Sequence, residues 1–137
     1  MKSICNTLAT AALCVVPLAV NADEIWNSQQ FGEIAYEKDI GSIAVLSMAG
    51  GHPGSRAFIY LPGLGGNSTD RGVFTGYWIE TAPGDCATDK VSEDGIESNL
   101  WGKAEVEFEK PEFPSGFVLR VGSCDGDYAD EGWADPS

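Results

Sequence analysis

From residue 33 onward, apolar and polar residues alternate in short runs that predict β-strands. The clearest run is Trp101–Lys110, in which small or apolar residues alternate with lysine and glutamate. A strand of this kind has one dry face and one wet face, which is typical of an antiparallel sheet. Apolar spacing of three and four residues never persists for a dozen positions, so the chain predicts no long helix after its N-terminal segment.

Five further segments have a strand-like composition. They are Glu33–Lys38, Ser42–Met48, Ser55–Leu61, Val73–Glu80 and Phe117–Val121. The second of these is apolar on both faces, as expected for a strand buried on both sides. Residues near Ile25 and Trp26 could add another strand. Gly76, inside an aromatic run, marks a bend, a bulge or a close approach of two backbones.

Turn-forming residues separate these runs and set the fold class. Glycine and proline cluster at 50–54, 62–67 and 111–116, and the one long connection, Ala82–Asn99, is polar. Strands joined by tight turns without a crossover helix predict an all-β domain. We expect a small antiparallel meander barrel or sandwich of about 6–8 strands over residues 23–124. Residues 125–137 are expected to form an acidic, loosely ordered C-terminal tail.

Residues 1–22 have the features of a secretory signal peptide. Lys2 is followed by an apolar stretch, and Val20-Asn21-Ala22 suits cleavage by signal peptidase after Ala22. A transmembrane anchor is the alternative, but polar residues interrupt the stretch. A lipoprotein signal at Cys14 is disfavoured because Leu13 stands where a small residue is expected. The sequence therefore predicts an exported protein, periplasmic or secreted, with no membrane span after cleavage.

The cysteines support this compartment. Cys86 and Cys124 remain after cleavage, and an even pair in an oxidising compartment predicts a disulfide, with two reduced thiols as the alternative. The bridge would tie the long polar connection to the start of the acidic tail. Closing a loop of this length stabilises a domain by about 4 kcal/mol.

The charge balance restricts the partners. The chain has 21 acidic and 8 basic residues, and all of the acidic residues follow Ala22. Nucleic acid and anionic membranes repel such a surface, whereas a cationic protein or a divalent cation is attracted to it. Solubility alone is the alternative explanation for the acidity.

Four carboxylates gather near the C-terminus and suggest a calcium site. They are Asp125, Asp127, Asp130 and Glu131. Flexible acidic loops supply the oxygen ligands that Ca²⁺ prefers, although the order of residues is not that of an EF-hand. A solvated acidic tail is the alternative. We expect no other cofactor.

No catalytic motif is apparent, so we expect no enzymatic activity. The chain lacks the Gly-x-Ser-x-Gly elbow of α/β-hydrolases. The only histidine, His52, lies in a Gly-Pro turn, and the sequence identifies no buried acid behind it. A single histidine with two oxidised cysteines also excludes a His/Cys zinc site.

Aromatic residues are the best candidates for binding. Tyr77, Trp78 and Trp101 fall on strands, where they either line a ligand cavity or fill the core, and Trp133 stands apart in the acidic tail. The segments around Trp78 and Trp101 resemble strands of small secreted meander barrels of the avidin-like and lipocalin-like kind. No diagnostic motif accompanies the resemblance, so it assigns no site residues.

Two functions therefore compete. The first is a binding or inhibitor module that uses surface loops and its acidic surface on an unknown, cationic partner. Its candidate loops are 50–54, 64–70 and 82–99. The second is a carrier for a small ligand inside an aromatic-lined barrel. An uncharacterised exported domain without enzymatic activity is the remaining alternative.

Overall fold

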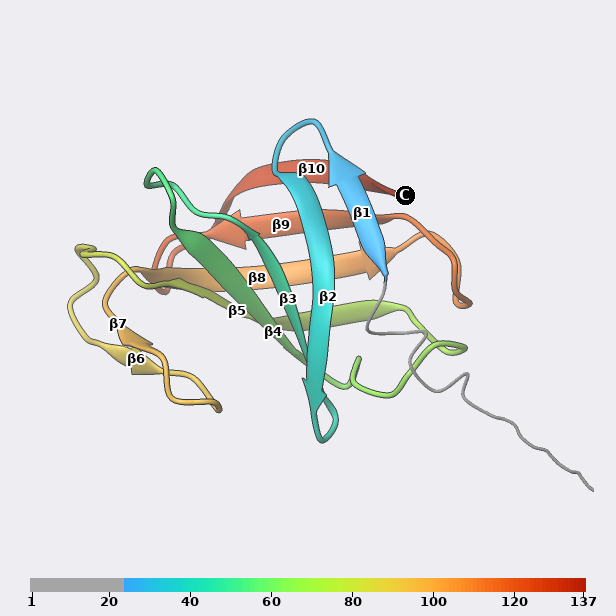
Figure 1. The fold of residues 1–137 in the computed structure, drawn as a ribbon, viewed down its shortest axis with the longest axis horizontal. Coiled ribbons are helices and arrows are strands. Elements are labelled where there is room, and N and C mark those ends of the chain that lie inside the picture. The colour runs from blue at the N-terminus through green and yellow to red at the C-terminus, as the bar shows by residue number, and fades with distance from the viewer. Residues whose placement is uncertain (1–23) are drawn as a thin grey trace, which may run out of the picture.

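The structure is a computed structural model that describes residues 24–137, and its strands form a closed antiparallel barrel (Figure 1). The barrel strands are β1 (Ile25–Ser28), β2 (Gly32–Ile40), β3 (Ile43–Ala49), β4 (Arg56–Pro62), β5 (Val73–Glu80), β8 (Trp101–Phe108), β9 (Phe117–Gly122) and β10 (Tyr128–Pro136). A separate hairpin consists of β6 (Lys90–Val91) and β7 (Glu97–Ser98). The predicted signal peptide, residues 1–22, lies outside the described residues.

Strands that follow one another along the chain are neighbours in the barrel, so the fold is the predicted meander. Only the β6–β7 hairpin interrupts this order, between β5 and β8. The barrel closes where β10 pairs with β1, with Ser28 opposite Ala134 and Trp26 opposite Pro136. The all-β, antiparallel prediction is confirmed, and the barrel replaces the sandwich alternative. Across residues 24–137 no helix is long and apolar enough to cross a membrane.

The expectation of a loosely ordered acidic tail is wrong. Residues Tyr128–Pro136 form β10, which hydrogen-bonds to β9 on one side and to β1 on the other. Its acidic side chains point mainly outward, while Ala134 is fully buried in the barrel. Without this strand the barrel would have two open edges.

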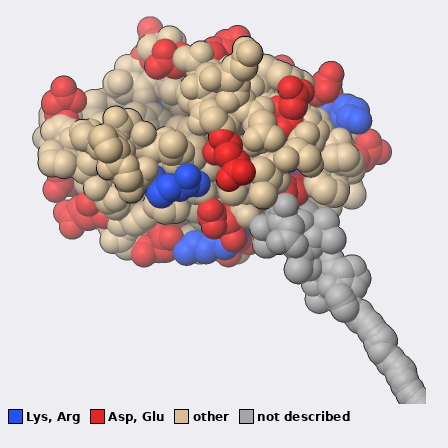
Figure 2. Space-filling view, turned by 45° about the horizontal axis from the view of Figure 1, so that its top comes forward, with Lys and Arg blue, Asp and Glu red and all other residues tan. Residues whose placement is uncertain are grey.

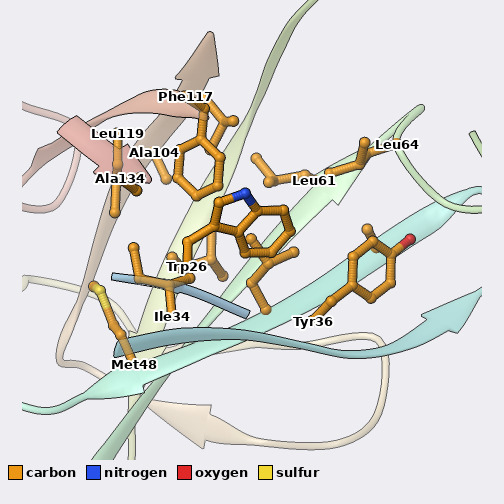
Figure 3. Close-up of a cluster of buried hydrophobic side chains, with 14 of the residues drawn as sticks. Trp26, Ile34, Tyr36, Met48, Leu61, Leu64, Ala104, Phe117, Leu119 and Ala134 are labelled. Atoms are coloured by element: carbon orange, nitrogen blue, oxygen red, sulfur yellow. The ribbon is translucent and has the colours of Figure 1, made fainter. Parts of the chain in front are cut away.

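Large side chains fill most of the barrel interior, so the interior is a packed core (Figure 3). Trp26 lies against Phe117 with ring centroids 4.9 Å apart, and its indole Nε1 donates to the carbonyl oxygen of Ser115 at 2.8 Å. Gly76 marks a close approach, because a Cβ there would lie 1.8 Å from the carbonyl oxygen of Tyr60. The aromatic-lined cavity expected for a ligand carrier is therefore occupied by protein.

A buried ion pair closes one end of the barrel. The guanidinium of Arg71 donates to both carboxylate oxygens of Glu24 at 2.9 Å, and the two side chains are 0% and 1% exposed. Arg71 also lies over the ring of Phe108, 5.1 Å from its centroid. The β4–β5 loop carries Arg71 across this end and adds the fully buried Leu64. We call this the closed end.

A second apolar cluster lies on the outer wall, under the connection from β5 to β8. Tyr60 and Trp101 are buried there, and Tyr77 stacks on Tyr60 with ring centroids 5.0 Å apart. The β6–β7 hairpin covers the cluster, and its acidic turn accepts hydrogen bonds from two hydroxyls, Tyr60 to Asp94 and Tyr77 to Glu93, both at 2.6 Å. The cluster includes Val45 from β3, whose side chain points away from the barrel interior. Both faces of that strand are therefore buried, which explains why it is apolar on both.

The predicted disulfide joins Cys86 to Cys124, with Cα atoms 5.6 Å apart. It fastens the long connection to the turn after β9. A disulfide in a small barrel of this kind is compatible with export.

The meander gathers four connections at the end opposite the closed end. They are the turns and loops at 29–31, 50–55, 81–100 and 123–127. Two of the three loops proposed from sequence, 50–54 and 82–99, lie at this end, whereas 64–70 belongs to the closed end. We call the loop-bearing end the open end.

Candidate functional site

A pocket of about 320 Å³ opens into the barrel at the open end. We call it the mouth pocket. Its apolar lining comes from four strands, the β1–β2 turn and the long connection, and consists of Phe31, Met48, Ala49, Ala57, Trp78, Leu100 and Val121. Its polar lining includes His52, Glu80 and Asp130. A concave, mostly apolar surface with a few polar groups at one side is the usual form of a small-molecule site.

Trp78 is held in a fixed orientation in this lining. Its indole Nε1 donates to the carbonyl oxygen of Gly122 at 2.7 Å. Gly102, on the neighbouring strand, provides the space, because a Cβ there would lie 2.5 Å from that nitrogen. With its one polar atom satisfied, the rest of the indole presents apolar surface.

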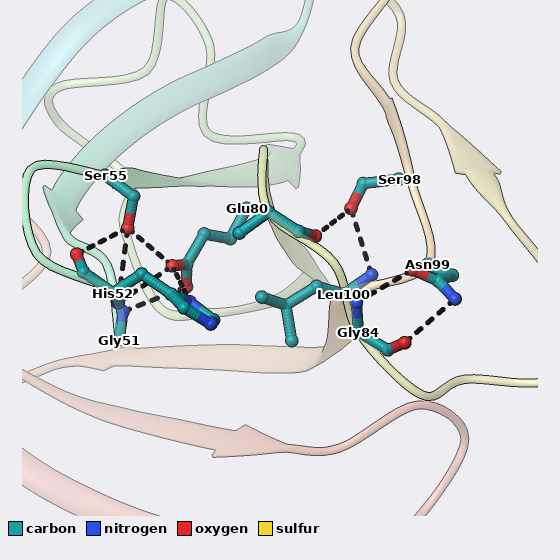
Figure 4. Close-up of polar contacts among 9 residues, drawn as sticks. Gly51, His52, Ser55, Glu80, Gly84, Ser98, Asn99 and Leu100 are labelled. Carbon is teal, nitrogen blue, oxygen red and sulfur yellow. Dashed lines mark hydrogen bonds and ion pairs between the residues drawn. The ribbon is translucent and has the colours of Figure 1, made fainter.

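Glu80 is the last residue of β5 and organises the polar side of the pocket (Figure 4). Its side chain is 4% exposed, and four donors surround its carboxylate. The backbone N–H groups of Gly51 and His52 lie at 3.0 and 3.2 Å, the hydroxyl of Ser55 at 2.6 Å and the imidazole Nδ1 of His52 at 3.1 Å. One carboxylate thus folds the whole β3–β4 loop around itself.

The environment of Glu80 keeps it ionised. Burial acts to raise the pKa of its carboxyl group, but the hydrogen bonds from Ser55, Gly51 and His52 outweigh burial and hold that pKa below its ordinary value. Gly50 makes this approach feasible, because a Cβ there would lie 2.2 Å from the Ser55 hydroxyl oxygen and 2.6 Å from a Glu80 oxygen.

The pairing with Glu80 determines which nitrogen His52 offers. When Nδ1 of the neutral imidazole donates to the carboxylate, Nε2 is left as a hydrogen-bond acceptor. The side chain is 53% exposed and lies at the rim of the mouth pocket. The Ser55 hydroxyl contacts Glu80 and the backbone of His52, so the three residues do not form the Ser–His–acid relay of a hydrolase.

Hydrogen bonds within the long connection fix Leu100 at the rim, where its carbonyl oxygen accepts from the Glu80 N–H at 2.9 Å. The side-chain amide of Asn99 donates to the Gly84 carbonyl oxygen at 3.0 Å and accepts from the Gly84 N–H at 2.9 Å. The Leu100 N–H donates to the Ser98 hydroxyl at 3.0 Å (Figure 4). The rim residues of the pocket are therefore held by local polar contacts before any ligand binds.

The four aromatic candidates do not form one site. Trp78 lines the mouth pocket, and Trp133 lies on the outer face of β10. Tyr77 and Trp101 belong to the outer cluster, where Lys90 lies 4.6 and 4.8 Å from their ring centroids. Burial and the hydrogen bond to Glu93 raise the pKa of the Tyr77 hydroxyl.

The acidic candidates are also separated. Across the described residues 24–137, no three His, Cys, Asp or Glu side chains converge so as to hold a metal ion. Asp125 and Asp127 lie in the turn before β10, and Asp130 lines the mouth pocket. Glu131 accepts a hydrogen bond from Arg120 at 3.0 Å. The expected calcium ligands are thus distributed along a turn and a strand.

Sequence reasoning missed Glu80 as the acid behind His52. Alternation along β5 indicated that Glu80 faces inward, because Trp78 and Glu80 are two residues apart and face the same side of the sheet. A glutamate on the inner face of an aromatic strand requires a partner, since burying an unpaired charge is costly. The identity of that partner depended on the pairing of β4 with β5, which the sequence did not reveal.

Comparison with known proteins finds no matching family, no similar curated protein and no similar solved structure.

Proposed function

We propose that the protein is an exported, non-enzymatic binding domain that holds a small, mostly apolar ligand in the mouth pocket. The observation that carries this proposal is the pairing of a fixed apolar lining with one oriented imidazole at the open end of the barrel. This is the alternative considered from sequence, the small-ligand carrier, with the ligand proposed at the mouth rather than in the filled interior.

The chemistry of the pocket suggests the class of ligand. Aromatic and aliphatic side chains would contact rings or short chains, and Nε2 of His52 would accept a hydrogen bond from one ligand donor. The ionised Glu80 and the acidic surface disfavour an anionic ligand. We therefore propose a neutral ligand with one N–H or O–H group.

A fluorescent probe of this chemistry tests the proposal. N-phenyl-1-naphthylamine is apolar and has a single N–H donor, and it should bind saturably with increased emission. Ala49→Phe places a ring at an exposed position of the pocket rim and should abolish the increase. Val91→Phe adds the same ring at an exposed position on β6 and should leave binding intact.

A further variant tests the proposed hydrogen bond. His52→Ala should weaken probe binding about fivefold, the effect of losing one hydrogen bond. Probe emission that is unchanged in Ala49→Phe would contradict the proposed site. Binding that is abolished in Ala49→Phe but unchanged in His52→Ala would retain the site and reject the role of the imidazole.

A second candidate function rests on where the cations are placed. Arg71 forms an ion pair with Glu24, Lys38 lies 2.9 Å from Asp94, and Arg120 contacts three glutamates. The surplus of carboxylates therefore faces solvent, and Figure 2 shows acidic side chains spread widely over one face. This charge supports a binding or inhibitor module for a cationic protein, which would be captured at low salt and released at high salt. Failure to capture any basic partner at low salt would reject it.

Export is part of both proposals. Cleavage after Ala22 would retain Glu24, whose side chain pairs with Arg71 at the closed end of the barrel. Export would place the disulfide in an oxidising compartment. N-terminal sequencing of protein recovered from the periplasm or culture medium should begin at Asp23. A retained residue 1–22 segment would contradict this.

A further inference from the structure

We propose that the outer face of β10 is a second binding site, for a neutral saccharide, built around Trp133. A groove of about 580 Å³ lies there, between the strand and the β1–β2 turn. Trp133 is 41% exposed, which is unusual for so large an apolar side chain. The groove is distinct from the mouth pocket, so the inference does not depend on the proposed function.

The indole of Trp133 is held in place before any ligand binds. Its Nε1 donates to a carboxylate oxygen of Asp135, two residues along the same outer face. Its six-membered ring rests on Gly116, where a Cβ would lie 2.6 Å from the nearest ring carbon. A ring fixed at two points loses little conformational freedom on binding, and this favours affinity.

The rest of the groove is polar but nearly uncharged. Asn27 lies on β1, and Gln29 and Gln30 lie in the β1–β2 turn, all three exposed. Each side-chain amide supplies both donors and an acceptor. The single lining carboxylate, Asp135, already accepts the hydrogen bond of the indole.

Gly132 completes the groove by allowing the turn to approach the strand. A Cβ there would lie 2.6 Å from the Cβ of Gln30 and 2.8 Å from the ring of Phe31. This close packing brings the glutamine-bearing turn next to the strand that carries Trp133. The amides and the indole form one surface.

A pyranose ring matches this combination of groups. It has an apolar C–H face that packs on an indole, and hydroxyls around its edge that both donate and accept hydrogen bonds. A cationic ligand would favour free carboxylates around the ring, and an anionic ligand would be repelled by the overall charge. The groove is therefore best matched by an uncharged, polyhydroxylated ring.

The test uses three tetrasaccharides as probes, namely cellotetraose, maltotetraose and tetra-N-acetylchitotetraose. Binding is followed through the indole N–H signal of Trp133 in NMR spectra of the ¹⁵N-labelled protein, identified with a Trp133→Phe variant. At least one probe should move this signal saturably. Trp133→Ala should weaken binding about tenfold or more, and Asn27→Ala should weaken it to a smaller extent.

Tyr128→Ala is the matched control, because Tyr128 is exposed on the same strand and lies outside the groove. It should bind the saccharide like the unaltered protein. No response to any of the three probes, or equal affinity in Trp133→Ala, would overturn the proposal. A response of Trp133 to tetramethylammonium but to no saccharide would overturn it in favour of a cation site. The mouth pocket is read separately through the Trp78 signal, so the two proposals fail independently.

Discussion

The carboxylate of Glu80 lies 3.1 Å from Nδ1 of His52, across 28 positions of sequence. The contact joins the end of β5 to the loop between β3 and β4. It orients the only histidine of the chain at the rim of the mouth pocket. The same carboxylate also holds two backbone N–H groups, so Glu80 has a structural role as well as an orienting one.

Replacing Glu80 by glutamine should destabilise the domain. A glutamine side chain has only one acceptor oxygen. Its NH₂ group would face N–H and O–H donors whose hydrogen bonds the carboxylate now accepts. Leaving buried donors unpaired costs about 1–3 kcal/mol in the free energy of unfolding. Urea denaturation at neutral pH measures the loss. Glu109→Gln, at an exposed position, is the control and should change stability little.

The effect of Glu80→Gln should depend on pH. The pKa of Glu80 is lower in the folded protein than in the unfolded chain, so ionised Glu80 stabilises the fold above the unfolded value of about 4.3. That stabilisation is lost as pH falls through the folded pKa. The difference in unfolding free energy between the unaltered protein and Glu80→Gln should therefore shrink in acid. A difference that is as large in acid as at neutral pH would contradict the ionised state.

Removing the disulfide should weaken the open end most. A Cys86→Ser/Cys124→Ser variant should lose about 4 kcal/mol of unfolding free energy, as expected from loop closure. The outer cluster that includes both cysteines and Trp101 should also loosen, which would shift tryptophan emission to longer wavelength. Reduction of the unaltered protein serves as the comparison and should give the same stability. Equal unfolding free energies with and without the disulfide would show that the disulfide does not stabilise the fold.

The buried ion pair at the closed end should be strongly coupled. Glu24→Leu or Arg71→Met alone leaves an uncompensated buried charge and should cost about 3–5 kcal/mol. The double variant Glu24→Leu/Arg71→Met should cost less than the sum of the single variants, because no unpaired charge remains. Unfolding free energies of all four proteins give the coupling. Additive losses would mean that the two side chains stabilise the barrel independently.

Period-two alternation made most of the barrel predictable. The prediction for Val73–Glu80 matches β5 at both ends, and the other predicted strands differ from those observed by one or two residues at their ends. The antiparallel meander followed from the short turns. The disulfide followed from cysteine number and compartment, and it is confirmed.

The last strand escaped prediction for a packing reason. Its inward residues include Gly132 and Ala134, which are small, and Gln30 and Phe31 occupy the space beside Gly132. Phe31 lies so close to Gly132 that no side chain would fit there. A strand with small inward residues and acidic outward ones lacks the hydrophobic alternation on which the prediction relies.

The candidate site was less predictable because it depends on contacts between distant segments. Trp78 was identified from composition, but Glu80 and His52 come together only through the pairing of β4 with β5 and the folding of the intervening loop. Tyr77 and Trp101 could not be assigned to a wall or to a core until the β6–β7 hairpin was placed over them.

The central claim, that the open end of the barrel binds a small apolar ligand, is tested most directly by the indole N–H signals of the four tryptophans in NMR spectra. Saturating N-phenyl-1-naphthylamine should move the signal of Trp78, which lines the mouth pocket, and leave that of the core residue Trp26 in place. In Ala49→Phe the Trp78 signal should no longer respond. A Trp78 signal that does not move with the probe, or that moves equally in Ala49→Phe, would contradict the account.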